Sequence, residues 1–87
     1  MKIAVSHYKN SDKELFVNGG SIYIDGKYLV LKSFFRKIAL FNIDDVKYRK
    51  LPDELTFKAL EVYDNGQSYV LLLTKPNYFK LCEIIKI

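Results

Sequence analysis

Residues 20–50 read GSIYIDGKYLVLKSFFRKIALFNIDDVKYRK, and this stretch decides the expected fold. Runs of β-branched and aromatic residues follow one another, with turn-forming residues between them and no interval of helical spacing. Outward from it, Asn18-Gly19-Gly20, Asp25-Gly26 and Asn65-Gly66 are residues that accept the positive φ of tight hairpin turns. The pattern therefore predicts a series of antiparallel hairpins.

About seven strands are expected from this pattern. They cover residues 15–17, 21–24, 28–33, 37–42, 46–50, 55–63 and 67–73. A further short strand is expected at Lys2–Tyr8, followed by a polar loop or arm. Residues 69–73 are apolar at every position, which predicts a strand covered on one face by the opposing sheet and on the other by another element.

One helix is expected, at Pro76–Ile87, with Thr74 or Lys75 at its cap and Pro76 in its first turn. Apolar residues recur in it at the spacing of a buried face, and charged residues share the opposite face. The apolar stripe is Tyr78, Leu81, Cys82 and Ile85, and the charged face is Lys80, Glu83 and Lys86. The helix is expected to lie against a β surface.

Length and charge set broad limits on the class of protein. The chain has 87 residues, so we expect one domain, 1–87, in which residues 1–17 form an N-terminal extension and 76–87 the closing helix. The formal charge of +4 suits an anionic partner, and it equally suits a small domain that must stay in solution. A single cysteine and the lack of an apolar run of membrane-spanning length predict a cytoplasmic location, with peripheral membrane attachment as a variant.

Residues 29–46 combine an apolar strand, a turn with aromatic and basic residues, a second strand, and an Ile43-x-x-Val46 corner. With Pro76-x-x-Phe79 at the start of the final helix, residues 20–87 resemble the bacterial pleckstrin-homology-like (PH-like) domains. The resemblance implies a barrel or orthogonal sandwich of about seven antiparallel strands with one C-terminal helix. It also implies a non-catalytic domain that binds phosphoinositides, peptides or proteins, or that assembles into oligomers. An SH3-like barrel with an appended helix is the alternative fold.

The phosphoinositide-binding members of that family carry a Lys, a spacer and a Lys-x-Arg across their first hairpin. The nearest residues here are Lys27, Lys32 and Arg36-Lys37, with three residues between Lys32 and Arg36 where the family has one. This departure argues against specific binding of an inositol phosphate.

No residue set predicts an active site. His7 is expected to be a surface histidine, and the acid pairs Asp44-Asp45 and Asp53-Glu54 are expected beside turns. Cys82 falls on the apolar stripe of the helix, where an inert core thiol is expected. We therefore expect no catalytic residue, metal, cofactor or small-molecule substrate.

The strongest functional candidate is a set of cations and aromatic residues on three successive predicted strands and their turns. It comprises Lys32, Phe34, Phe35, Arg36, Lys37, Lys47, Arg49 and Lys50. If the strands pair in a meander, the later cations are expected near the 34–37 turn, where they would suit a lipid headgroup or a nucleic acid. The alternative is that the rings belong to the core and the cations only solvate the sheet.

The leading hypothesis is a non-enzymatic binding or assembly module. Its partner would be another protein or a second copy, captured at an exposed strand edge. Recognition of anionic lipid or nucleic acid through the basic set is the alternative, and an enzyme is the third hypothesis.

Overall fold

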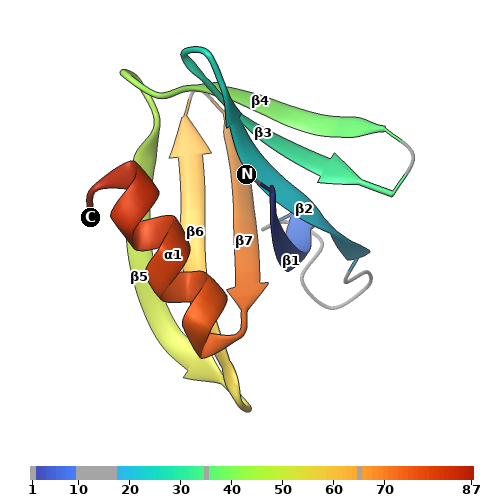
Figure 1. Ribbon diagram of the computed structural model, residues 1–87, viewed down its shortest axis with the longest axis vertical. Coiled ribbons are helices and arrows are strands. Elements are labelled where there is room, and N and C mark those ends of the chain that lie inside the picture. The colour runs from blue at the N-terminus through green and yellow to red at the C-terminus, as the bar shows by residue number, and fades with distance from the viewer. Residues whose placement is uncertain (1, 10–17, 35, 65) are drawn as a thin grey trace.

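The computed structural model describes residues 2–9, 18–34, 36–64 and 66–87. The protein is mainly β, as predicted, with seven antiparallel strands in one sheet and a C-terminal helix packed against it (Figure 1). The elements are β1 (Lys2–Lys9), β2 (Asn18–Asp25), β3 (Tyr28–Ser33), β4 (Lys37–Asn42), β5 (Lys47–Glu54), β6 (Phe57–Asp64), β7 (Gln67–Leu73) and α1 (Lys75–Ile85).

The strand order in the sheet is β4-β3-β2-β1-β7-β6-β5. The hairpins β2–β3 and β6–β7 turn at Gly26 and Gly66, whose φ values of 59° and 86° match the predicted positive-φ turns. β1 lies in the middle of the sheet, between β2 and β7, and joins the two groups of hairpins. Consequently β4 and β5, which are neighbours in the chain, are the two opposite edges of the sheet.

The sheet bends so that β2, β3 and β4 cross β5, β6 and β7 at a wide angle, and α1 lies over the latter group (Figure 1). The main core fills the space between the two groups and includes Ile22, Leu29 and Leu31 on one side and Leu60 and Leu71 on the other. Burial of these side chains supplies the main favourable free energy of folding. The sheet thus closes on itself around one apolar core.

Strand β7 is buried on both faces, as its sequence predicts. Leu71 and Leu73 point into the main core, which the opposing strands and α1 cover. Val70 faces the other side, where it forms a second, smaller cluster with Tyr8 and Ala59. On that outer face, the cover comes from side chains of neighbouring strands and not from a further element among the described residues.

Gly19 and Gly20 do not form the hairpin turn that was predicted there. Both lie inside β2, where Gly20 pairs with Val5 of β1 and Ser33 of β3. A Cβ atom on Gly20 would lie 2.0 Å from the carbonyl oxygen of Lys32. The glycine is therefore required for close approach of two strands, a role that gives the same sequence signal as a turn.

The predicted strand at 55–63 also begins too early. β5 runs on through Pro52 to Glu54, and the turn falls at Leu55, which has φ of 57° and is 96% exposed. Proline is tolerated here because β5 is an edge strand, whose outer N–H groups have no ladder partner. The predicted strand at 15–17 lies outside the described residues.

Helix α1 ends at Ile85, two residues before the predicted end, and Lys86 adopts the left-handed conformation of a C-cap. Thr74 is the N-cap residue. Tyr78, Leu81 and Cys82 are buried as predicted, and Ile85 packs against the same core. No helix among the described residues has the length and apolarity that crossing a membrane requires.

Candidate functional site

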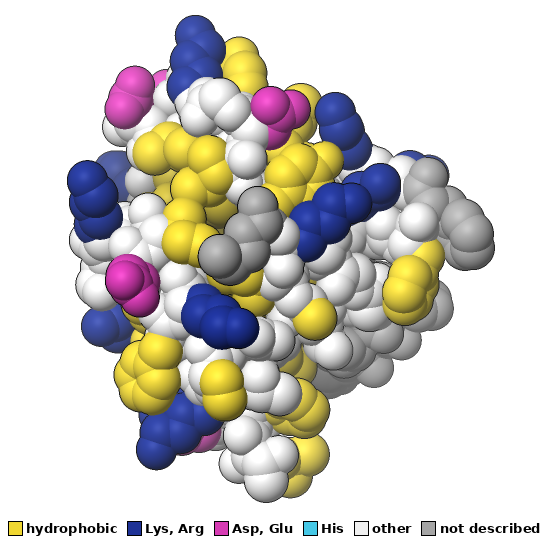
Figure 2. Space-filling model, in the orientation of Figure 1, with side chains coloured by type: hydrophobic (Ala, Val, Ile, Leu, Met, Phe, Trp, Pro, Cys, Tyr) yellow, Lys and Arg dark blue, Asp and Glu magenta, His cyan; other side chains and the backbone are white. Residues whose placement is uncertain are grey.

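The predicted basic set does not form one surface. Among the described strands, β4 pairs with β3 and β5 pairs with β6, so β4 and β5 do not pair with each other and do not form the meander that would join the set. Lys32, Phe34, Arg36 and Lys37 lie at the β3–β4 hairpin tip, whereas Lys47, Arg49 and Lys50 lie on β5 at the opposite edge of the sheet. Phe35 lies outside the described residues. Figure 2 shows the cations of one face scattered in several separate groups.

Arg49 is committed to an ion pair within the sheet. Its Nε donates to Oε1 of Glu61 over 2.7 Å, and its Nη2 pairs with the same oxygen. Glu61 is 3% exposed and also accepts a hydrogen bond from the hydroxyl of Ser68, at 2.6 Å. The Ser68 hydroxyl, followed by Arg49, lowers the pKa of Glu61 against the opposing effect of burial. Because removing Arg49 from this pair would leave a buried carboxylate less compensated, Arg49 is a poor candidate for binding an external anion.

The hairpin tip retains the features of a contact surface. Phe34 is 79% exposed, and Arg36 and Lys37 beside it are exposed as well. The tip is held by a backbone bond in which the N–H of Ser33 donates to the carbonyl of Arg36 over 2.9 Å. Of the predicted set, the structure therefore keeps together only Lys32, Phe34, Arg36 and Lys37.

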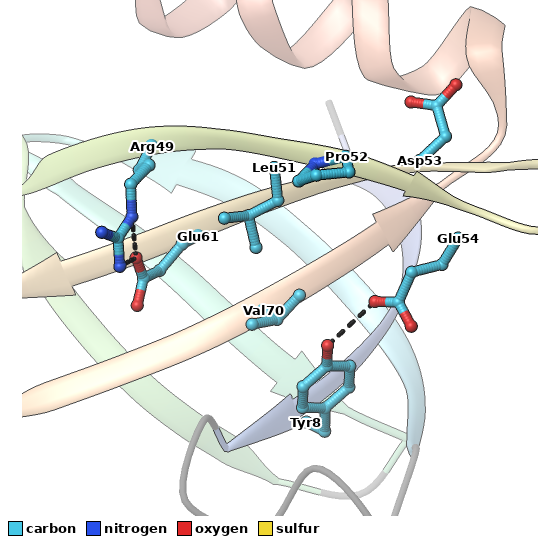
Figure 3. Close-up of a pocket in the computed structure, with 8 residues that line it drawn as sticks. All are labelled: Tyr8, Arg49, Leu51, Pro52, Asp53, Glu54, Glu61 and Val70. Atoms are coloured by element: carbon cyan, nitrogen blue, oxygen red, sulfur yellow. Dashed lines mark hydrogen bonds and ion pairs between the residues drawn. The ribbon is translucent and has the colours of Figure 1, made fainter.

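A shallow groove runs along the outer face of β5, β6 and β7, on the side of the strands opposite α1 (Figure 3). One part of it has a volume of about 350 Å³ and is lined by Tyr8, Arg49, Leu51, Pro52, Asp53, Glu54, Glu61 and Val70. Tyr8 points toward Glu54 across this part, and its hydroxyl donates to Oε2 of Glu54 over 2.9 Å (Figure 3). Burial and this carboxylate raise the pKa of Tyr8 to about 12.

The polar groups of the groove bond to one another. Tyr8 pairs with Glu54, and Glu61 pairs with both Arg49 and Ser68. A ligand that entered the groove would have to replace these hydrogen bonds. Its binding free energy would include only the difference between the bonds it forms and the bonds it breaks. The groove is therefore read as part of the packing of the outer face.

His7 is not the surface histidine that was predicted. It lies in β1, is 2% exposed, and its Nε2 has no hydrogen-bond partner among the described residues. Burial lowers the pKa of its imidazole, because the charged form loses hydration. The sequence could not reveal this position, because it depends on the pairing of β1 with β7.

Both acid pairs lie at turns of the chain. Asp44 and Asp45 lie in a turn, as predicted, where the Asp44 N–H donates to the side-chain oxygen of Asn42 over 2.9 Å. Asp53 and Glu54 are the last two residues of strand β5, directly before the turn at Leu55, so they too lie beside a turn. Cys82 is buried, as predicted. Within residues 2–9, 18–34, 36–64 and 66–87, no three acidic, histidine or cysteine side chains are grouped as a metal site would require.

The two edge strands differ in how well they are protected against pairing with another chain. β5 carries three cations and Pro52, which are typical devices that prevent edge-to-edge association. β4 has the sequence KIALFN, with one charge at its first residue and no proline. Its Leu40 is 48% exposed, and its pairing with β3 has an irregularity only near Ile38. Strand β4 is therefore the less protected edge.

The ladder shows which backbone groups of β4 point outward. The N–H of Ile43 donates to the carbonyl of Lys27 over 2.9 Å, which makes residues 27 and 43 a hydrogen-bonded pair. Bonded and non-bonded pairs alternate in an antiparallel ladder, so Leu29 bonds Phe41 while Leu40 sits in a non-bonded pair with Val30. The N–H and carbonyl of Leu40 therefore point away from β3, toward the open edge.

Sequence reasoning expected an exposed strand edge without identifying which strand supplies it. The signal was present, because residues 37–42 lack the charges and proline of residues 47–54. It could not be used, because the pairing of β1 with β7, which makes β4 an edge, joins segments far apart in the chain.

Comparison of the sequence with protein-family models and with curated proteins found no match. The functional conclusion therefore depends on the geometry of the chain itself.

Proposed function

We propose that this protein is a PH-like, non-enzymatic binding module that captures an extended segment of a protein partner along the open edge of β4. The strand order and the helix that covers one end of the core are compatible with a PH-like fold. The observation that carries the proposal is that no described strand pairs with the outer edge of β4, where the outward backbone groups of Leu40 lie beside its half-exposed side chain.

A partner strand added there would gain hydrogen bonds from the Leu40 backbone and apolar contact with its side chain. In such β-augmentation the main chain provides affinity, and pockets for alternate side chains provide specificity. Val30 and Tyr23 continue from Leu40 across the same outer face, because the three residues pair in register on β4, β3 and β2. An added strand would therefore extend an existing apolar row.

The proposal is tested with peptides selected from a random display library for binding to the intact chain. We expect the selected peptides to shift the backbone amide resonances of residues 39–42, and above all that of Leu40. Leu40→Pro removes the outward N–H without breaking a bond to β3, so it should abolish this binding.

Leu40→Ala is the matched control, because it shortens the same side chain and keeps the N–H. Strand addition should survive in Leu40→Ala with reduced affinity, whereas docking by side chain alone would fail in both variants. Peptides that bind Leu40→Pro as tightly as the original chain, or that shift the groove residues Leu51 and Val70 instead, would contradict the proposal.

A second candidate function is attachment to an anionic surface through the hairpin tip. Exposed Phe34 beside Lys32, Arg36 and Lys37 is the observation that favours it, because aromatic rings and cations together suit a membrane interface. Co-sedimentation with phosphatidylserine vesicles is compared for Lys32→Gln/Lys37→Gln and Lys47→Gln/Lys50→Gln. Both pairs remove the same charge, so loss of binding in the first pair alone supports the tip, and equal effects mean only general attraction.

A further inference from the structure

We infer that the partner that best fits the open edge of β4 is a second copy of the same strand, which pairs antiparallel about a two-fold axis at Leu40. This inference rests on the proposed function, since it assigns an occupant to the same edge. Two copies joined in this way would share one continuous sheet across the β4–β4 contact.

The direction of the backbone groups restricts the register. Beyond the irregularity near Ile38, residues that bond inward to β3 and residues that face outward alternate from Ala39 to Asn42, so only registers that set outward residues opposite outward residues form hydrogen bonds. An axis at Leu40 satisfies this rule and pairs residues 39–41 of one copy with residues 41–39 of the other. It also sets the outward N–H of each Leu40 opposite the carbonyl of the other Leu40.

The same register brings the exposed apolar side chains together. Each Leu40, 48% exposed in the single chain, would contact its equivalent on the outer face. The apolar row of Tyr23, Val30 and Leu40 would then continue into the row of the second copy. Cross-strand apolar pairs of this kind stabilise a sheet.

Charge complementarity distinguishes this register from the neighbouring one. With the axis at Leu40, the end of β4 next to Arg36 in one copy meets the end of β4 next to Asp44 in the other, so the basic hairpin tip comes near the acidic turn at both ends of the contact. With the axis moved to Ala39, the partner strand shifts by two residues, which takes the acidic turn of each copy away from the basic tip of the other. Arg36 and Asp44 are both exposed, and Asp44 bonds to the Asn42 side chain through its backbone N–H and not through its carboxylate.

The test is sedimentation equilibrium of the intact chain from low micromolar to near-millimolar concentration. We expect a reversible monomer–dimer equilibrium without larger species, because the contact is closed by its two-fold axis. Leu40→Lys should weaken the dimer roughly tenfold or more, since it sets two cations opposite each other at the axis. Leu55→Lys, the same change at a leucine far along the chain that is 96% exposed, should leave the dimer unchanged.

Charge reversal tests the register itself. Arg36→Asp and Asp44→Arg should each weaken the dimer about tenfold, and the double variant should restore it to within about threefold of the original. The register would be overturned if neither single variant weakened the dimer, or if the double variant formed a dimer as weak as those of the single variants.

A chain that stays monomeric at every concentration would overturn the inference as a whole. If library peptides still shifted the Leu40 amide in that case, the proposed function would stand with a foreign strand as its partner. If the library peptides did not bind β4 either, the proposed function and the dimer inference would both be wrong.

Discussion

Replacing Gly20 by alanine tests how closely β2 and β3 are held together. The added Cβ would lie 2.0 Å from the carbonyl oxygen of Lys32 and 3.1 Å from Cα of Ser33, and both are backbone atoms that no side-chain rotation can move. The Cβ–oxygen separation must grow to about 3.4 Å for ordinary contact. Strands β2 and β3 would therefore have to move apart by roughly 1 Å or more. This movement exceeds the tolerance of an N–H···O hydrogen bond, so the ladder between them must open locally.

We expect Gly20→Ala to lower the free energy of unfolding by about 2–4 kcal/mol, from one or two lost ladder bonds and the strain of separating the strands. At about 4–8 °C per kcal/mol for a domain of this size, the melting temperature should fall by about 8–32 °C. Thermal and urea unfolding followed by circular dichroism measure both quantities.

Gly19→Ala is the matched control, because it makes the same change one residue earlier in the same strand. Among the described residues, its Cβ would meet the Phe34 ring, at 3.4 Å, which is an ordinary contact with a side chain and not with backbone. We expect a change within about 0.5 kcal/mol. Equal stability of the two variants would refute the reasoning that Gly20 is kept for close strand approach.

Three further perturbations test other parts of the structure. Burial lowers the pKa of His7, so below its ordinary pKa of 6.5 the unfolded chain binds more protons than the folded chain. The free energy of unfolding should therefore fall as pH decreases from 7 toward the lowered pKa. Urea unfolding of His7→Leu should lack this dependence on pH. Ser68→Ala should lower the free energy of unfolding by about 1.5–3 kcal/mol at pH 7, because it removes the hydroxyl that lowers the pKa of Glu61. This loss should become smaller at acid pH, where the Glu61 carboxyl is protonated. A loss that does not depend on pH would contradict this role of Ser68. Leu55→Gly should raise the free energy of unfolding by about 0.5–1 kcal/mol, because Leu55 is exposed and adopts a φ of 57°, which glycine accepts without strain. A lower melting temperature of this variant would show that the Leu55 side chain has a packing role.

Local signals in the sequence were sufficient to predict the hairpins that turn at Gly26 and Gly66 and the C-terminal helix. Gly26 and Gly66 mark turns because their positive φ is rare in other residues, and the buried stripe of α1 follows directly from its spacing. Gly19-Gly20 misled the same reasoning, because glycine serves a turn and a close strand contact equally well.

Long-range pairing was not accessible from local signals. β1 pairs with both β2 and β7, and this central position separates β4 and β5 to opposite edges and divides the basic set. It also buries His7, which a polar sequence context suggested to be on the surface. Thus only part of the candidate site, the hairpin tip, follows from the sequence, while the open edge of β4 required the topology.

Hydrogen exchange at the Leu40 amide, measured over a range of protein concentrations, tests the central claim most directly. This N–H points away from β3, so in a single chain it should exchange with solvent, and it should gain protection only when another strand pairs with β4. We predict protection that rises with protein concentration, while the amide of Phe41, bonded to β3, stays protected throughout. Exchange at Leu40 that is fast at every concentration, with and without selected peptides, would contradict the claim that β4 is a binding edge.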